Sequence, residues 1–176
     1  MRSRGFGVAA AIAFALLAGA VPAAQGEGIT IETPAGPVTC APDPEREPEP
    51  EALSTTPFAR GLRVAIRETG AFRCAVPELG EVELTGAGLP WQLTLNEKHL
   101  TARLKGSRKP GVLLQPVGLP FVSCIYQANK VLGTLSLSGS PSVSVTATRV
   151  RLNEALSNGL CPALGPVSLE ITLPSS

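Results

Sequence analysis

Few side chains in this sequence are of the types that carry out acid–base or nucleophilic chemistry. His99 is the one histidine among the 176 residues, and a catalytic triad or an imidazole general base would have to use it. It follows Asn96, Glu97 and Lys98, a polar stretch typical of an exposed hairpin loop. No serine stands in a Gly-x-Ser-x-Gly nucleophile motif. Catalysis that depends on His99 is therefore an alternative that the sequence does not favour.

A pair of carboxylates could hydrolyse a glycosidic bond. Glu81 and Glu83 lie on one face of an alternating segment and would stand about 7 Å apart, a separation that the two carboxylates of a glycosidase can have. Both occupy polar positions of that segment, and such positions usually face solvent. A secreted hydrolase that uses this pair or His99 is the enzymatic alternative, and we assign no catalytic residue.

Four basic residues cluster around the turn signals Gly106-Ser107 and Pro110-Gly111. A solvated turn is the simpler interpretation, and the alternative is a binding patch for anionic polymers of the cell envelope. No aromatic residue interleaves the cluster, so stacking on single-stranded nucleic acid is not indicated. The residues of this possible binding patch are Arg103, Lys105, Arg108 and Lys109.

The first 23 residues have the pattern of a secretory signal peptide. Arg2 and Arg4 precede the apolar run Val8 to Ala20, and small residues follow it at 21–23. The run is shorter than the roughly 20 residues that span a membrane. We expect cleavage, release of one domain at 24–176 without a transmembrane anchor, and a secreted or envelope-associated location. The remaining net charge of −1 gives no strong attraction to nucleic acid or anionic membranes.

All four cysteines lie after this segment, and an even number of cysteines in an exported chain predicts disulfides. Of the three possible connectivities we predict Cys40–Cys74 and Cys124–Cys161. Each closes a loop of about 35 residues and would stabilise the fold by roughly 3–4 kcal/mol. A zinc site is not indicated, because the closest cysteines are 34 positions apart and the chain has one histidine. We predict no metal.

Composition excludes several classes of protein. Charged residues make up 16% of the chain, against about 25% in average soluble proteins, while 18 Gly and 17 Pro punctuate it. This argues against a basic transcription factor, a long helical bundle, a haem or histidine-rich metal protein and a large multidomain enzyme. No Gly-rich phosphate loop precedes a helix pattern, so no nucleotide cofactor is predicted.

Short runs of alternating apolar and polar residues, separated by Gly and Pro, predict about ten strands. They indicate an all-β fold, an antiparallel β-sandwich of the Ig-like or jelly-roll-like kind. The alternation slips at 148–150, which suggests a bulge, and one helical turn is expected at 153–157. The predicted strands are 29–31, 62–66, 82–84, 91–95, 100–104, 112–114, 121–126, 131–137, 142–147 and 167–173.

Residues 42–57 interrupt this pattern with an acidic, Pro- and Glu-rich stretch that has no apolar face. Such a segment buries too little surface to order itself, so we predict an exposed, extended loop. The alternative, a recognition or calcium-binding segment, is opposed by the stiffening of the prolines.

Two aromatic residues suggest where the core lies. Trp91 is in phase with Leu93 and Leu95, which favours a core position over a carbohydrate-stacking platform. Tyr126 follows Cys124 by two positions and is expected to pack near that disulfide with its hydroxyl at the edge.

Three short motifs in the second half carry a resemblance. They are Gly88-Leu89-Pro90-Trp91 entering a strand, Cys124-Ile125-Tyr126 followed by Gly133-Thr134-Leu135, and Leu160-Cys161-Pro162 before a last strand. Over about residues 70–173 the chain resembles uncharacterised secreted β-domain proteins of actinobacteria with two disulfides. The resemblance implies an exported, disulfide-bonded β domain and no transferable activity.

These observations together favour an exported, non-catalytic binding or structural module of the cell envelope or the extracellular medium. Its partner would be an envelope or extracellular component that the sequence does not name. The alternatives are the secreted hydrolase above and a small secreted inhibitor that acts through the loop at 42–51 or 105–111.

Overall fold

The computed structural model describes residues 28–46, 53–58, 61–96, 98–136 and 142–172, and in this part the chain is almost entirely antiparallel β-strand. Five long segments run up and down through the fold, and a short connection divides each into two strands. The segments are β4 (Gly61–Ile66) with β5 (Ala71–Val76), β6 (Gly80–Ala87) with β7 (Trp91–Asn96), β8 (Thr101–Gly106) with β9 (Gly111–Pro116), β10 (Cys124–Ala128) with β11 (Val131–Ser136), and β12 (Ser142–Ala147) with β13 (Val150–Leu152).

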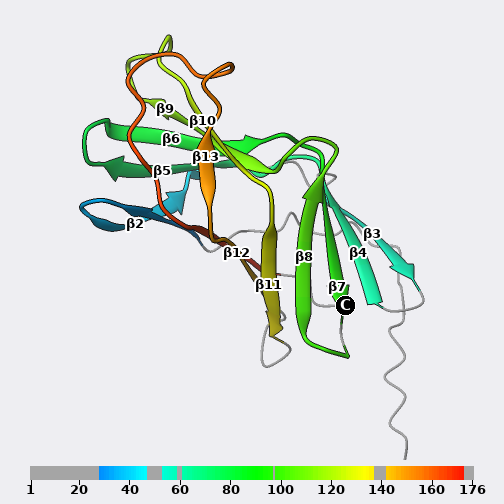
Figure 1. Cartoon of the computed structure of the whole chain (residues 1–176). Helices are drawn as coiled ribbons and strands as arrows, with labels where there is room; N and C mark the ends of the chain where they lie inside the picture. Colours follow the sequence, from blue (N-terminus) through cyan, green and yellow to red (C-terminus); the bar gives the residue numbers. More distant parts are fainter. Residues whose placement is uncertain (1–27, 47–52, 59–60, 97, 137–141, 173–176) are drawn as a thin grey trace, which may run out of the picture.

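The two strands of each segment belong to different halves of the sheet. In the first half-sheet the segments pair in the order β4-β7-β8-β11-β12, and in the second they pair in the same order, as β5-β6-β9-β10-β13. The fold is therefore a meander of bent strands. Figure 1 shows the second half-sheet at the upper left and the first at the lower right.

Three further strands join the halves. β14 (Val167–Thr172) pairs with β12, β1 (Gly28–Thr33) pairs with β14, and β2 (Gly36–Pro42) pairs with β1. At its end β2 also pairs with β5 of the second half-sheet, through Ala41 with Arg73 and Pro42 with Phe72. We call this junction the seam. β3 (Leu53–Phe58) pairs with β4 at the opposite edge.

The predicted all-β, antiparallel fold is confirmed, but its arrangement differs from the prediction of a sandwich. The 14 described strands form one continuous sheet that curls on itself. The prediction was about ten strands in two separate sheets. The physical reason is that each segment bends and passes from one half to the other, so the halves share their strands. The phase slip at 148–150 marks one of these bends, between β12 and β13.

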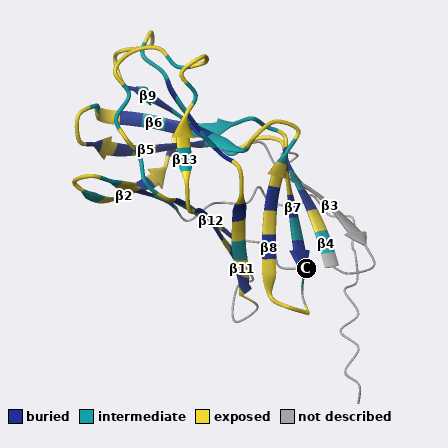
Figure 2. Cartoon of the chain, viewed as in Figure 1, coloured by how far each residue is buried: buried dark blue, intermediate teal, exposed yellow. Residues whose placement is uncertain are grey.

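Buried side chains form two clusters, one on each half-sheet (Figure 2). Trp91 and Leu93 belong to the first cluster, and Leu114 and Tyr126 to the second. Leu169 of β14 packs against both. The apolar positions of the alternating strands therefore face the inside of the curl, as their period of two requires.

The acidic segment at 42–57 is more ordered than predicted. Asp43 is buried, residues 44–46 form a 3-10 turn (η1, Pro44–Arg46), and residues 53–58 form β3. The prediction of an exposed extended loop is thus wrong at both ends of the segment. Asp43 is held by the charged partner Arg73, and β3 pairs with β4. Residues 47–52 lie outside the described residues.

Two other local predictions are also corrected. The stretch 153–157 is a turn closed by the amide of Leu156 on the carbonyl of Asn153, at 3.1 Å, and contains no helix. The strand predicted at 121–126 begins only at Cys124, and Phe121 is 68% exposed. The signal peptide predicted at 1–23 lies outside the described residues. Within the described ranges, no helix is long and apolar enough to cross a membrane.

Both predicted disulfides, Cys40–Cys74 and Cys124–Cys161, are present. Cys40 lies on β2 and Cys74 on β5, so the first disulfide spans the seam. The second ties the start of β10 to the segment that leads into β14.

Removal of either disulfide should destabilise the fold strongly. The bridged cysteines are 34 and 37 positions apart, and loops of that length predict a loss of about 4 kcal/mol in the free energy of unfolding. Urea denaturation of the double variants C40A/C74A and C124A/C161A measures it. The exposed control Ser107→Ala should stay within about 0.5 kcal/mol of the parent. A loss below about 1 kcal/mol in C40A/C74A would show that the seam holds without its disulfide.

Candidate functional site

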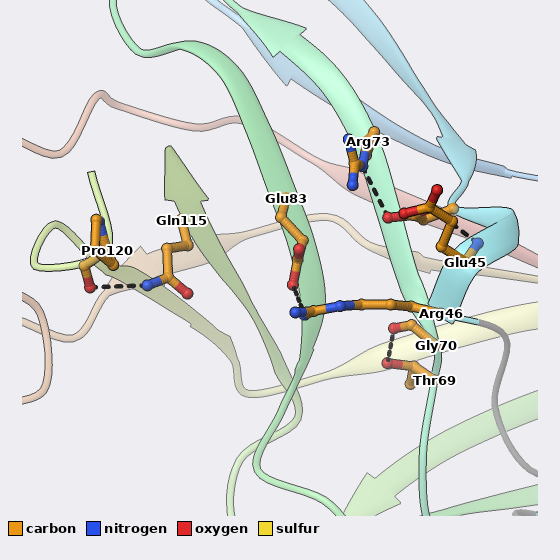
Figure 3. A network of polar contacts seen from close by, with 9 residues as sticks. Glu45, Arg46, Thr69, Gly70, Arg73, Glu83, Gln115 and Pro120 are labelled. Carbon is orange, nitrogen blue, oxygen red and sulfur yellow. Dashed lines mark hydrogen bonds and ion pairs between the residues drawn. The ribbon is translucent and has the colours of Figure 1, made fainter. Parts of the chain in front are cut away.

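Charged side chains beside the seam form a charged network of two separate sets of ion pairs, and Figure 3 shows the hydrogen bonds of Arg73 and Arg46 in them. Arg73 donates from Nε to Oδ2 of Asp43 at 2.8 Å, and its Nη1 lies 3.9 Å from Oε1 of Glu81. Arg46 of η1 reaches across to Glu83 on β6, with Nη1 and Oε1 2.6 Å apart. The network therefore links η1, β5 and β6 through complementary charges.

This network occupies the two glutamates of the hydrolase alternative. Both carboxylates face an arginine, Glu83 at hydrogen-bond distance and Glu81 more loosely. Neither glutamate lines either of the two cavities described below. The geometry thus places Glu83 in an ion pair between β6 and η1, and Glu81 in a loose ion pair between β6 and β5.

Asp43 is the buried polar centre of this region, with 3% of its surface exposed. The amide of Glu45 donates to its Oδ1 at 3.1 Å, and Arg73 donates to its Oδ2. The backbone hydrogen bond, together with the Arg73 guanidinium, holds the pKa of the Asp43 carboxyl below its usual value. Asp43 also raises the pKa of Arg73. The pair therefore stays charged at neutral pH.

The variant Asp43→Asn should be less stable at neutral pH and should lose part of the acid sensitivity of the parent. The lowered pKa stabilises the fold above the unfolded-state pKa of about 4, and this contribution disappears as the pH falls through the lower folded-state value. Urea midpoints measured from neutral to strongly acidic pH test this, with Glu45→Gln as the exposed control. Parallel pH profiles for Asp43→Asn and the parent would contradict it.

His99 lies in the turn between β7 and β8, where it is exposed. Its backbone amide donates to Oδ1 of Asn96 at 3.3 Å, and no carboxylate or hydroxyl among the described residues contacts its imidazole. Nor do the described residues contain a group of three or more His, Cys, Asp or Glu side chains placed to hold a metal ion. The residues that could do chemistry are thus not brought together around His99.

The two aromatic residues lie in the core, as predicted. Trp91 is 5% exposed and donates from Nε1 to the carbonyl of Ala87 at 3.0 Å, so its ring is not a carbohydrate platform. Tyr126 is 2% exposed and shares a cluster with Cys124. Its hydroxyl donates to the carbonyl of Pro162, next to Cys161, at 2.6 Å. Burial, with a contribution from Glu78, raises the pKa of Tyr126 to about 12.

Tyr126 should therefore ionise late and make the fold sensitive to alkali. The unfolded chain loses this proton near pH 10, so the stabilisation is complete below about pH 10 and is lost by pH 12, a change of about 3 kcal/mol. Tyr126 is the one tyrosine of the chain, so ultraviolet absorbance of tyrosinate reports it directly. Tyr126→Phe, the control, should lack the signal and the alkaline loss. Titration near pH 10 in the folded protein would contradict the burial argument.

The cavities are ill suited to a drug-sized ligand. One, of about 50 Å³, lies between the half-sheets and is lined by apolar side chains that include Trp91, Leu104 and Val145. The other is an open groove of about 430 Å³ between the β1–β2 turn and the end of β5, and it contains no ionisable side chain. Neither is like the enclosed pockets of about 300–1,000 Å³ that usually hold small organic molecules, because the first is too small and the second is open to solvent. The surface offers two more extensive candidate sites.

One surface candidate is an apolar tip on two loops at the far end of the second half-sheet, seen at the top of Figure 1. Both loops are largely exposed (Figure 2). The loop before β10 and the loop after β13 contribute large apolar side chains that are 45–93% exposed. Sequence analysis missed this tip, because residues 121–123 follow a strand pattern. The residues of the apolar tip are Val117, Leu119, Phe121, Leu156 and Leu160.

The two loops of the tip are fixed to each other. Ser123 donates from its amide and its hydroxyl to Oδ1 of Asn158, at 2.7 and 2.8 Å, and the two backbones form a bridge. Gly159 lies so close to Val122 that an added Cβ would meet that side chain. The Cys124–Cys161 disulfide closes the same pair of loops. Phe121 and Leu160 therefore flank a rigid contact.

A second candidate surface contains the predicted basic patch. Arg103 and Lys105 lie on the exposed face of β8, and Arg108 and Lys109 lie in the connection to β9. All four are exposed, and none forms an ion pair with a carboxylate of the described residues. The structure thus places the four predicted residues on neighbouring positions.

Comparison of the chain with models of protein families, with curated proteins and with solved structures gave no match. The resemblance to secreted actinobacterial β-domain proteins therefore stays a prediction.

Proposed function

We propose that this protein is an exported, non-catalytic binding module of the cell envelope or the extracellular medium, and that the apolar tip contacts a partner protein. The observation that carries the proposal is the exposure of Phe121 at 68% and Leu160 at 93% on loops that are fixed to each other. Contiguous exposed apolar side chains usually mark an interaction site in a soluble protein.

The construction of the tip favours a protein partner. Flexible loops lose conformational entropy when they bind, whereas loops held by a disulfide and by Asn158 have largely lost it already. A convex tip with an aromatic and an aliphatic anchor suits an apolar pocket on another protein. Insertion into lipid would instead bring the irregular loop backbone of residues 117–123 towards hydrocarbon, which is unfavourable.

Other observations support a binding role over an enzymatic one. Glu81 and Glu83 are engaged by arginines, the His99 imidazole has no carboxylate partner among the described residues, and the interior cavity is about 50 Å³. The two disulfides are compatible with an oxidising compartment, as expected for an exported chain.

Phe121→Asp combined with Leu160→Asp should abolish partner binding without unfolding the protein. Each change puts a charge where an apolar contact would be buried, so we expect at least tenfold weaker capture of the partner. The measurement is photo-crosslinking, during secretion by the producing cells, from an unnatural aromatic residue at 156, a tip position that the double variant leaves unchanged. The matched control is Leu100→Asp, because Leu100 is exposed at 45%, like Leu119, but lies in the β7–β8 turn.

One discrete adduct with another protein, formed by the parent and by Leu100→Asp but lost in the double variant, would support the proposal. Equal capture by all three would overturn it. An adduct of twice the chain mass would assign the tip to self-association. If the parent floats with zwitterionic phosphatidylcholine vesicles and the double variant does not, the tip would be assigned to a lipid surface.

A further inference from the structure

The charges of this chain are strongly segregated along the sequence. From Lys98 to Asn153 there are eight basic residues and no Asp or Glu. This stretch forms three of the five bent segments, which are neighbours in the sheet. The segregation in sequence therefore becomes a segregation on the surface.

Strand register brings basic residues from different segments side by side. Leu104 pairs with Val131 at one end of the β8–β11 ladder, and Lys105 and Lys130 are the residues that follow this last pair on the two chain segments. The pairing of β11 with β12 extends to Leu132–Thr146, and Lys130 and Arg149 lie in the bends just beyond this end of the ladder. Because the three segments are neighbours in the sheet, with strands about 4.8 Å apart, these cations form a row across them.

The connection between β8 and β9 adds two cations to the end of this row. Arg108 and Lys109 lie in it, and its last residue, Pro110, accepts a hydrogen bond from the amide of Ala128 at 2.8 Å. Gly88, with φ of +76°, lets the neighbouring bend approach the Lys109 carbonyl more closely than a side chain would allow. The connection is therefore fixed against both neighbours. We call the six residues the basic face: Arg103, Lys105, Arg108, Lys109, Lys130 and Arg149.

The basic face differs from the charged network at the seam. There Arg46 and Arg73 face carboxylates, whereas none of the six cations forms an ion pair within the described chain. All six are exposed. Like charges on adjacent strands repel one another, so this arrangement is a local cost to the fold that an anionic ligand would remove.

We infer that the basic face binds a linear polyanion, a chain molecule with repeating phosphate or carboxylate groups. The row follows the bends, and the half-sheets and their cavity lie on the inner side of the curl. A ridge of cations matches a flexible anionic chain laid along it, whereas a flat bilayer would meet such a ridge along one line. This inference is independent of the apolar tip.

The test measures binding of fluorescent long-chain inorganic polyphosphate and poly-L-glutamate to the oxidised protein at several salt concentrations. The variant Lys105→Gln/Lys130→Gln removes two cations of the row. The matched control, Lys98→Gln/Arg151→Gln, removes two exposed cations of the same acid-free stretch from the β7–β8 turn and from β13. Both variants have the same net charge, and thermal unfolding checks their fold.

We expect the parent to bind at least one polymer at about 0.15 M salt, with an affinity that falls steeply as salt rises. The row variant should bind at least tenfold more weakly and with a salt slope smaller by about 2, and the control should change less than about twofold. Binding of polyphosphate alone would identify phosphate as the anion, and binding of both polymers would extend it to carboxylate.

Three results would overturn the inference. They are no binding of either polymer by the parent, equal weakening in the row variant and the control, and binding to anionic phosphatidylglycerol vesicles but to neither polymer. Because F121D/L160D leaves the basic face intact, it should bind the polymer like the parent. Failure of the polymer test and failure of the partner proposal are therefore distinguishable.

Discussion

The closure of this fold depends on the seam where β2 meets β5. Only two residue pairs join these strands, yet this short ladder connects one half-sheet to the other. The Cys40–Cys74 disulfide bridges the same strands, and directly after the ladder the buried Asp43 carboxylate accepts a hydrogen bond from Arg73. A covalent bond and a charge-assisted hydrogen bond thus reinforce the shortest pairing in the order. Cys74 and Arg73, the β5 residues of these two interactions, fix the position of β5 against the hairpin of β1 and β2.

The bends explain why both candidate surfaces lie on the same three segments. Each segment has one half in each half-sheet, so its bend is displayed on the outside of the curl and its far end forms a loop. Bends contribute Lys130 and Arg149, and loops contribute Phe121 and Leu160. The core needs only the inward positions of these strands. The fold is therefore free to vary charge at the bends and apolar surface at the tip independently of each other.

Periodicity in the sequence predicted the strands whose apolar residues alternate, such as β7 and β12, and the even number of cysteines predicted both disulfides. It missed β2, β3, β5 and β13. Prolines conceal the alternation in β2 and β3, and the pairing of β3 with β4 cannot be read from the local sequence. It also predicted two sheets where bends make one. For the basic face it found the four residues that are close in sequence. Lys130 and Arg149 join them through strand register, which no short motif encodes.

The pairing of β1 with β14 sets the order in which the sheet can be completed. Ile29 lies opposite Leu169, so the first and the last described strands are neighbours. The five bent segments pair with neighbours in the sequence and can form as the chain is synthesised, whereas β1 has to wait for β14. Until then β12 and β1 are open strand edges, which invite pairing with other chains. A chain that stopped before Val167 would keep both edges open permanently, so the C-terminal strand protects against aggregation as well as completing the sheet.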